Sequence, residues 1–189
     1  MPDVYTRFDL PAVRAELLKR LARGEVGILP TDTIYGLSGD ATNAAVVRRI
    51  HRIKRRRTPL SVVAPSLEWA RASVAPPVPL EKLARKYAGA FTVLCRAAPR
   101  FVLPAAAGSK LLGLRFCEHW VSELAAELGR PVVSTSVNRT RAAPMTSLET
   151  LDAGIAREVD FIVYEGERAG PASTLVWVRG PKPKLEHRA

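Results

Sequence analysis

The sequence is poor in the residues that build metal centres and disulfide frameworks, and it has no long apolar run. Two of its 189 residues are cysteine and three are histidine. No CxxC, HExxH or Cys/His cluster appears, which argues against a zinc site and a disulfide scaffold. No apolar run approaches the roughly 18 residues of a membrane span. Residues 1–10 lack the apolar stretch of a secretory signal, so we expect a cytoplasmic protein that does not contact a membrane.

Several common catalytic and phosphate-binding motifs are also absent. The chain has no GxxxxGK[ST] segment, no GxGxxG after a strand and no GxSxG elbow. These absences exclude a P-loop, a dinucleotide-binding fingerprint and a hydrolase nucleophile elbow. Any phosphate chemistry must therefore use other residues.

Acidic residues are in the minority. Lysine and arginine number 29 against 18 aspartates and glutamates, a formal charge of +11. This excess favours anionic partners such as nucleic acid or a phosphorylated ligand. Aromatic residues make up 6% and apolar residues 47%, so we expect an ordinary core built mainly of aliphatic side chains.

Predicted helices and strands alternate along the chain, which indicates an α/β fold in one domain over residues 1–189. Apolar periodicity, caps and glycine positions predict helices at 9–24, 44–53, 66–75, 80–88, 121–128 and 148–156. Short apolar runs predict strands at 26–29, 60–64, 91–96, 113–117, 132–136, 161–164 and 174–178. The short basic tail, 179–189, is expected to be ordered only if it docks on another part of the molecule.

A loop with three hydroxyl groups and a carboxylate follows the strand that ends at Pro30. It reads Thr31-Asp32-Thr33-Ile34-Tyr35-Gly36. Ligands of open α/β sheets bind beyond the carboxyl ends of strands, so this loop lies where a small polar substrate would bind. The alternative is a turn whose hydroxyls satisfy only their own backbone.

A basic cluster covers residues 48–57, where seven of ten positions are lysine or arginine. Lys54 and Arg56 lie where the helix breaks before Pro59, and we expect them to point into a cleft. A bound anion would relieve the crowding of like charges. The alternative is a solvated basic face without a partner.

Three further polar signals occur at strands. Arg115 lies in an apolar run, so it either meets a carboxylate or binds a ligand anion. Hydroxyl and amide side chains follow the strand at 132–136, as Ser134, Ser136 and Asn138, although such residues also cap helices. Ser173 opens the last strand.

Taken together, these segments resemble the YrdC-like family of threonylcarbamoyl-AMP synthases. The resemblance rests on PTDTIYGL, IKRR followed by PLSVV, AFTVL, GLRF followed by His119, STSVN and the final ST pair, in family order over residues 10–178. It implies a twisted mixed sheet flanked by helices, with an open basic cleft. It also implies condensation of L-threonine, bicarbonate and ATP to threonylcarbamoyl-AMP and pyrophosphate, which serves the modification of adenosine 37 of tRNA.

The resemblance also implies roles for individual residues. On the threonine side it places the side chains of Thr31, Thr33, Tyr35, His119, Ser136 and Ser173. On the nucleotide side it places Lys54, Arg56, Arg115, Ser134, Asn138 and Arg188, with Lys54 and Arg56 also holding the carboxylated intermediate. The loop after Arg56 is shorter than in the family, and Arg57 or Thr58 is expected to replace the polar residue that it lacks.

The resemblance implies ATP with Mg²⁺ as the substrate complex, bicarbonate as co-substrate, and no permanent cofactor or protein-held metal. Expected partners are tRNA and the machinery that transfers the threonylcarbamoyl group, and the chain is expected to be a monomer or homodimer. A competing hypothesis is a tRNA-binding or double-stranded-RNA-binding module on the same fold with little or no synthase activity. The basic cluster favours that module, whereas the scarcity of aromatics for base stacking argues against it.

Overall fold

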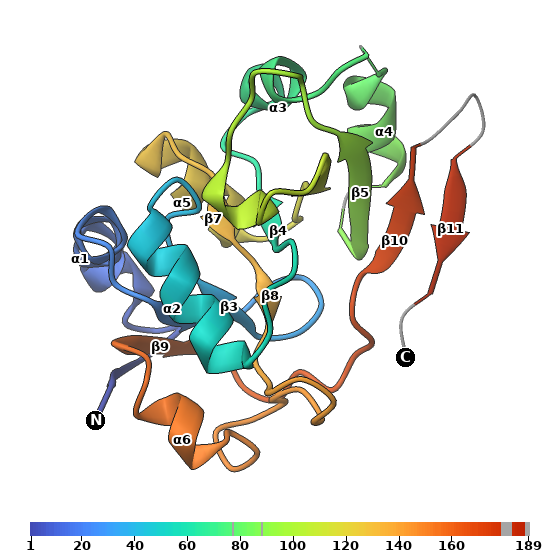
Figure 1. The fold of residues 1–189 in the computed structure, drawn as a ribbon. Helices are drawn as coiled ribbons and strands as arrows, with labels where there is room; N and C mark the ends of the chain where they lie inside the picture. Colours follow the sequence, from blue (N-terminus) through green and yellow to red (C-terminus); the bar gives the residue numbers. More distant parts are fainter. Residues whose placement is uncertain (77, 88, 179–182, 188–189) are drawn as a thin grey trace.

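The computed structural model describes residues 1–76, 78–87, 89–178 and 183–187, and it divides the strands of these residues between two sheets (Figure 1). The first sheet runs β1 (Asp3–Thr6), β9 (Phe161–Tyr164), β2 (Gly27–Leu29), β3 (Gly36–Ser38), β8 (Thr135–Ser136). The second runs β11 (Lys184–Glu186), β10 (Thr174–Trp177), β5 (Phe91–Arg96), β6 (Leu111–Arg115), β4 (Ser61–Val63), β7 (Val132–Val133). Both sheets mix parallel and antiparallel pairs. The α/β class is therefore confirmed, but two mixed sheets replace the single sheet that we expected.

The two sheets meet where one predicted strand is broken. Residues 132–136 were expected to form one strand, but β7 pairs with β4 in the second sheet and β8 pairs with β3 in the first. Ser134 lies between them, and its backbone N–H donates to the carbonyl of Ser61 at 2.8 Å. The chain thus passes from one sheet to the other at a serine, which brings polar side chains to the seam.

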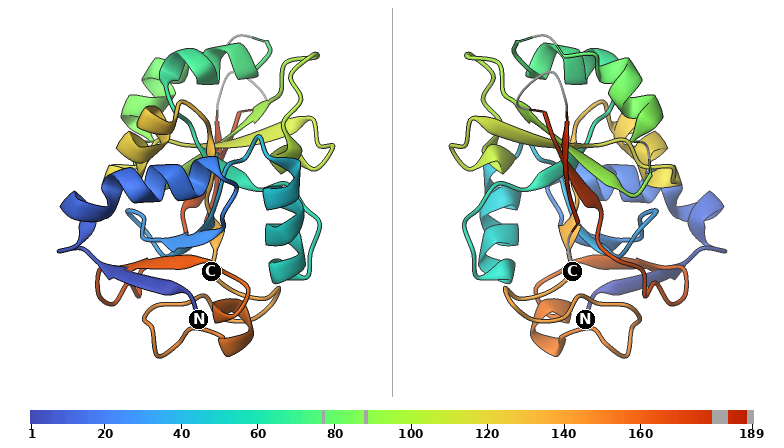
Figure 2. Two further views of the ribbon diagram at one scale, coloured as in Figure 1. Left: turned by 90° about the vertical axis from the view of Figure 1, so that its left-hand side faces the viewer. Right: turned by 90° about the vertical axis from the view of Figure 1, so that its right-hand side faces the viewer.

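Helices cover the sheets on several sides. Helices α1 (Leu10–Ala22) and α5 (Trp120–Leu128) pack against each other, and Figure 2 shows α1 and α2 (Ala44–Lys54) on opposite sides of the strands. The remaining helices are α3 (Leu67–Ser73), α4 (Leu80–Lys86), α6 (Ala153–Ala156) and the short 3₁₀ turn at Pro104–Ala106. No helix in the described part of the chain is long and apolar enough to cross a bilayer.

Helix α2 forms as the sequence predicts. The Asn43 side chain accepts a hydrogen bond from the backbone of Ala45 at 2.9 Å and so caps the helix. Ile50 and Ile53 are fully buried against the core, whereas Arg48 and Arg52 are exposed on the outer surface. The helix ends at Lys54, and Arg55 takes a left-handed conformation with φ of 52°.

Other local predictions were wrong. The Asp9 carboxylate accepts from the backbone and hydroxyl of Thr6, both at 2.7 Å, instead of capping α1. The helix expected at 148–156 shrinks to α6, because Asp152 caps it through the backbone N–H of Ile155 at 2.8 Å. The strand expected at 113–117 lies two residues earlier, as β6.

Three strands were not predicted. Strands β1 and β3 lie in segments without strand periodicity, and β11 lies in the tail. Strand β11 pairs antiparallel with β10. This part of the tail therefore docks on the second sheet, which is the condition under which we expected it to be ordered. The division into a single domain with a separate tail at 179–189 stays a prediction, because 179–182 and 188–189 lie outside the described residues.

Candidate functional site

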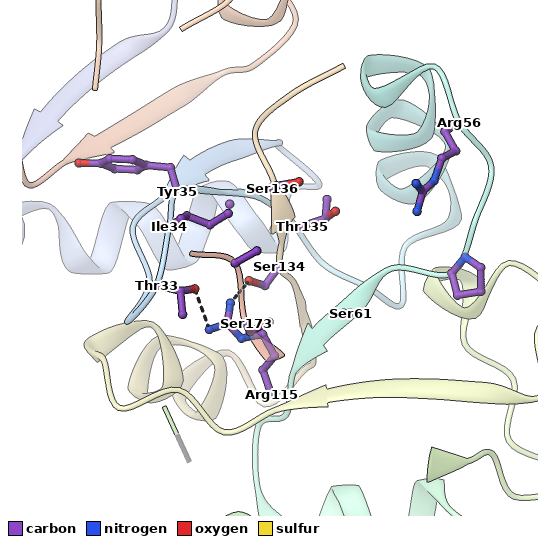
Figure 3. Close-up of a pocket in the computed structure, with 13 residues that line it drawn as sticks. Thr33, Ile34, Tyr35, Arg56, Ser61, Arg115, Ser134, Thr135, Ser136 and Ser173 are labelled. Carbon is purple, nitrogen blue, oxygen red and sulfur yellow. Dashed lines mark hydrogen bonds between the residues drawn. The ribbon is translucent and has the colours of Figure 1, made fainter. Parts of the chain in front are cut away.

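A cleft with an empty volume of about 500 Å³ opens at the seam between the two sheets (Figure 3). Thr33, Ile34, Tyr35, Gly36, Arg56, Pro59, Ser61, Arg115, Ser134, Thr135, Ser136, Ala172 and Ser173 line it. Its lining is mostly hydroxyl and guanidinium groups, so a ligand there would be held largely by hydrogen bonds and charge.

The hydroxyls of the loop after β2 divide between the backbone and the cleft. Thr31 is buried, and its hydroxyl donates to the carbonyl of Ile34 at 2.7 Å and accepts from the backbone of Thr33 at 3.2 Å. Thr31 thus stabilises the turn, which agrees for this residue with the interpretation that the hydroxyls satisfy their own backbone. Thr33 lines the cleft, with its hydroxyl 3.0 Å from that of Thr31.

Tyr35 lines the cleft, but its aromatic ring does not face it. Its ring points away from the cleft residues (Figure 3) and stacks on Tyr164 with centroids 5.9 Å apart. The phenol donates to the carbonyl of Gly166 at 2.6 Å and accepts from the backbone of Glu165 at 2.9 Å. Burial raises the pKa of this phenol, so it stays protonated and anchors the loop after β9.

Arg115 reaches the cleft from the carboxyl end of β6 and is 4% exposed. Its Nη2 forms an ion pair with Asp32 and donates to the Thr33 hydroxyl at 3.2 Å. Its Nη1 lies 3.4 Å from the Ser134 hydroxyl. The sequence left open whether Arg115 meets a carboxylate or a ligand anion, and the structure supplies the carboxylate while leaving the side chain on the cleft wall.

The loop after β8 is held by Lys54. The buried ammonium donates to the Ser136 carbonyl at 2.6 Å and to the Asn138 side-chain oxygen at 2.9 Å. Ser136 also donates to that oxygen, at 2.7 Å. Burial, with a smaller contribution from nearby Arg56, lowers the pKa of Lys54 to about 8. In this arrangement Ser136 lines the cleft, while Lys54 and Asn138 lie behind it.

Arg56 approaches the cleft from the opposite side to Arg115 (Figure 3). It is exposed, and its Nε donates to the Thr58 hydroxyl at 2.6 Å. Arg57 or Thr58 was expected to replace the polar residue that the short loop lacks. Of these two, Thr58 contacts Arg56, which lines the cleft. The left-handed turn at Arg55 separates buried Lys54 from exposed Arg56.

Ser173 is buried at the base of the cleft, and its hydroxyl lies 2.6 Å from that of Thr92 on β5. Thr92 is itself fully buried. A hydroxyl with a fixed neighbour has fewer orientations, which favours a defined contact with a ligand.

His119 lies outside the cleft lining, within a separate polar cluster. Its Nε2 is 3.1 Å from the Glu165 carboxylate, which also accepts from Trp120 at 2.7 Å and from Arg168 at 2.5 Å. Burial lowers the pKa of His119. Burial alone would raise the pKa of Glu165, but the bonds from Trp120 and Arg168 hold it below its usual value. Arg168 donates to the Thr31 carbonyl at 2.6 Å, which links this cluster to the cleft loop.

The structure thus gathers most of the expected site residues. Seven of them line the cleft, namely Thr33, Tyr35, Arg56, Arg115, Ser134, Ser136 and Ser173. Thr31, Lys54 and Asn138 contact lining residues from behind. His119 connects to the loop through Arg168, and Arg188 lies outside the described residues. The roles of these residues remain proposals.

Sequence reasoning missed four residues that fix this arrangement: Asp32, Thr92, Glu165 and Arg168. Asp32 carried a usable signal, because it lies in the same motif as Thr33 and a buried arginine needs a counterion. Thr92 is a lone hydroxyl within an apolar strand. Nothing in the local sequence indicated Glu165 and Arg168, whose partners lie in distant segments.

Among the described residues, no group of three histidine, cysteine or carboxylate side chains is placed to hold a metal ion. The described lining of the cleft includes no carboxylate.

Sequence comparison relates the chain to a known family. A model of the Sua5/YciO/YrdC family, described as "Telomere recombination", matches residues 19–189. The threonylcarbamoyl-AMP synthase of Stenotrophomonas maltophilia is 30% identical over 159 residues, which are 80% of this chain and 85% of that protein. The threonylcarbamoyl-AMP synthase of Xanthomonas euvesicatoria is 32% identical over 158 residues, 78% and 82% of the two chains.

Solved structures share the fold. The crystal structure of P. abyssi Sua5 complexed with L-threonine matches with a TM-score of 0.83 and 23% identity, covering 98% of this chain and 56% of that one. The crystal structure of E. coli YciO matches with a TM-score of 0.82 and 17% identity, covering 100% and 96%. The present chain therefore spans little more than half of the Sua5 chain and nearly all of YciO.

Proposed function

Because this chain belongs to the Sua5/YciO/YrdC family, we propose that it is a threonylcarbamoyl-AMP synthase, which condenses L-threonine, bicarbonate and ATP and releases pyrophosphate. The observation that carries the proposal is the cleft at the seam of the two sheets. It is lined by hydroxyls and by two arginines on opposite sides, within the region that matches the family. The relatives named as this synthase support the same activity.

The part of the cleft lined by hydroxyl groups suits threonine. Thr33, Ser136 and Ser173 offer hydroxyls that donate to a carboxylate or exchange hydrogen bonds with the substrate hydroxyl. The P. abyssi Sua5 chain, which shares this fold, was crystallised with L-threonine. Thr92 and the loop held by Lys54 limit the orientations of Ser173 and Ser136.

The two arginines suit a nucleotide. Arg56 is exposed at the cleft and free to meet the phosphates, with the magnesium ion carried by ATP. Arg115 is buried beside Ser134 and donates to an anionic oxygen at the reacting centre. Neutralising phosphate charge and holding the reactants in place supply most of the rate in such a site.

The reaction needs two bond-forming steps. Attack of the neutral threonine amine on the bicarbonate carbon forms the N–C bond of a carbamate and releases water. A carbamate oxygen then attacks the α-phosphorus of ATP, and the bond to pyrophosphate breaks. The residues of this chain contribute binding and orientation to both steps, with guanidinium groups facing the oxygens that gain negative charge.

The test is an assay with radiolabelled threonine, bicarbonate and ATP in which the adenylate product is resolved and identified. We expect a product that requires all three substrates, and equimolar pyrophosphate. ATP hydrolysis without a threonine-containing adenylate would contradict the proposal.

Substrate choice provides a second measurement. A site whose polar groups are committed to a hydroxyl rejects an analogue without it, because those groups are left buried and unpaired. Valine should therefore be a poor substrate, while serine loses a modest factor. Pyrophosphate release that is equally fast with valine would contradict the threonine assignment.

The exposed arginines of α2 and of the segment after it favour tRNA as a further partner. Arg48, Arg52, Arg55 and Arg57 are exposed and form no ion pair with any described residue. Binding through phosphates should weaken steeply with salt and show no sequence preference. Tight, salt-resistant binding of one RNA sequence without adenylate synthesis would instead support an RNA-binding module. We also propose the threonylcarbamoyl-transfer machinery as the acceptor of the product.

A further inference from the structure

The carboxylate of Asp32 lies behind the cleft wall and is held from two directions. Its side chain is 9% exposed and does not line the cleft. One oxygen, Oδ1, accepts from Nη2 of Arg115. The other, Oδ2, accepts from the backbone N–H of Glu118 at 3.1 Å. Both ends of the carboxylate are thereby fixed to the segment that leaves β6.

The two terminal nitrogens of the Arg115 guanidinium are engaged unequally. Nη2 is engaged by Asp32 and by the Thr33 hydroxyl at 3.2 Å. Among the described residues, Nη1 makes only long contacts, 3.5 Å to the Thr31 hydroxyl and 3.4 Å to the Ser134 hydroxyl, and the buried Nε has no hydrogen-bond partner. Contacts of this length are weak. Nη1 therefore retains donor capacity for another oxygen.

Nη1 lies beside a cleft residue, whereas Nη2 faces Asp32. Ser134, the neighbour of Nη1, lines the cleft together with Arg115 and Thr33 (Figure 3). A ligand oxygen can therefore approach Nη1 without displacing Asp32. A free guanidinium would be able to rotate, because its remaining contacts are to uncharged hydroxyls.

We propose that Asp32 is a positioning residue that fixes Arg115 with its Nη1 amino group toward the cleft, where this group binds an anionic oxygen of the substrate. The identity of that substrate as ATP rests on the proposed function. Asp32 itself touches no substrate and acts only through Arg115. The arginine is buried and partly neutralised, so its orientation matters more to binding than the net charge of the site.

This proposal makes the effect of Asp32 conditional on Arg115. Asp32→Ala should weaken ATP binding at least about fivefold, but should change it less than about twofold when Arg115 is already methionine, because residues acting through one another are not additive. Asp32→Asn keeps an oxygen for Arg115 and removes the charge, so it should restore ATP affinity to within about threefold of the parent protein.

The experiment is a calorimetric titration of ATP at fixed ionic strength into the parent protein, Asp32→Ala, Asp32→Asn, Arg115→Met and the double variant Asp32→Ala/Arg115→Met. Thermal melts check that each variant is folded. Asp40→Asn is the matched control, because Asp40 is a buried aspartate that pairs with Arg130 and does not line the cleft. This control should leave ATP affinity unchanged.

Asp32→Ala leaves a buried arginine without its counterion and is the variant at risk of unfolding. If it unfolds, Asp32→Asn and the double variant still decide the question, since the first should resemble the parent protein and the second should resemble Arg115→Met. Additive losses, or tighter ATP binding by Asp32→Ala, would overturn the inference. The experiment measures equilibrium binding of ATP and does not depend on catalysis. If the protein binds ATP but makes no adenylate, the proposed function is contradicted, while the ATP affinities of the variants still test the role of Asp32.

Discussion

Two sets of cations flank the cleft, and they are compensated differently. On the inner side, Arg115 and Arg168 are largely buried and face the carboxylates of Asp32 and Glu165. On the outer side, the exposed arginines of α2 and Arg56 form no ion pair within the part of the chain that the structure describes. Burying an unpaired charge is costly, whereas an exposed charge is solvated by water.

The difference separates two tasks. The inner cations are held in place by their partners, so they suit the orientation of a small substrate. The outer cations account for much of the excess positive charge and suit attraction of phosphates at the cleft mouth. Changes on the inner side should therefore affect stability and geometry, and changes on the outer side should affect mainly affinity for anions.

The largest expected effect is on the inner side. Glu165→Ala removes a carboxylate that holds Trp120, Arg168 and His119, and it should lower the free energy of unfolding by about 3 kcal/mol because it leaves Arg168 without its counterion. Urea denaturation measures this change.

The matched control is Glu127→Ala, which breaks an exposed pair with Arg14 and should have a much smaller effect. Equal losses in the two variants would mean that the inner pairs are no more important to stability than surface pairs.

The next effect concerns Lys54, the cation that lies between the two sets. Its pKa of about 8 lies below the ordinary value of 10.5, so between these values the unfolded chain binds more protons than the folded protein. Stability should therefore rise with pH in that range. The parent protein should gain about 2 kcal/mol relative to Lys54→Met between about pH 7.5 and about pH 9.5.

Urea denaturation of both proteins across this pH range provides the measurement. Other titrating groups are common to the two proteins and cancel in the difference. Parallel pH profiles would show that burial does not depress the lysine pKa and that Lys54 belongs with the solvated outer cations.

A smaller effect is expected on the outer side. Arg56→Ala should raise the Kd for ATP about tenfold, close to 1.4 kcal/mol, with little change in the thermal midpoint. Arg52→Ala removes the same charge four residues earlier, within α2, at a position outside the cleft lining. Calorimetry should show a change of less than about threefold for this control. Similar losses in both variants would mean that only the general field of α2 attracts the nucleotide.

Much of the fold was predictable because it depends on local chemistry. Asn43 and Ser66 cap their helices through backbone N–H groups within three residues, and Gly129 ends α5 in a left-handed conformation. Such signals lie within one turn of the chain. The split at Ser134 was not predictable, because strands of two residues have no periodicity to detect.

The candidate site divides in the same way. Thr33, Ser134 and Ser173 were found because polar residues at strand ends are recognisable in the sequence. The pairings that orient them were not, since Arg115 and Asp32 are 83 residues apart and Thr92 and Ser173 are 81 apart. A sequence shows that a buried arginine needs a partner, but the fold decides which carboxylate reaches it.

The smallest expected effect tests whether an outer arginine can be dispensed with. Arg55 is exposed and takes φ of 52°, a left-handed conformation that glycine adopts without steric cost. Arg55→Gly should raise the free energy of unfolding by about 1 kcal/mol relative to Arg55→Ala, because the two variants lose the same charge and only glycine relieves the backbone. Urea denaturation of both variants measures the difference, and ATP titration should show the same affinity for the two. A glycine variant no more stable than the alanine variant would show that the turn carries no strain. A lower ATP affinity in the glycine variant would show that a rigid turn at Arg55 holds Arg56 at the cleft, and the outer side would then share the fixed geometry of the inner side.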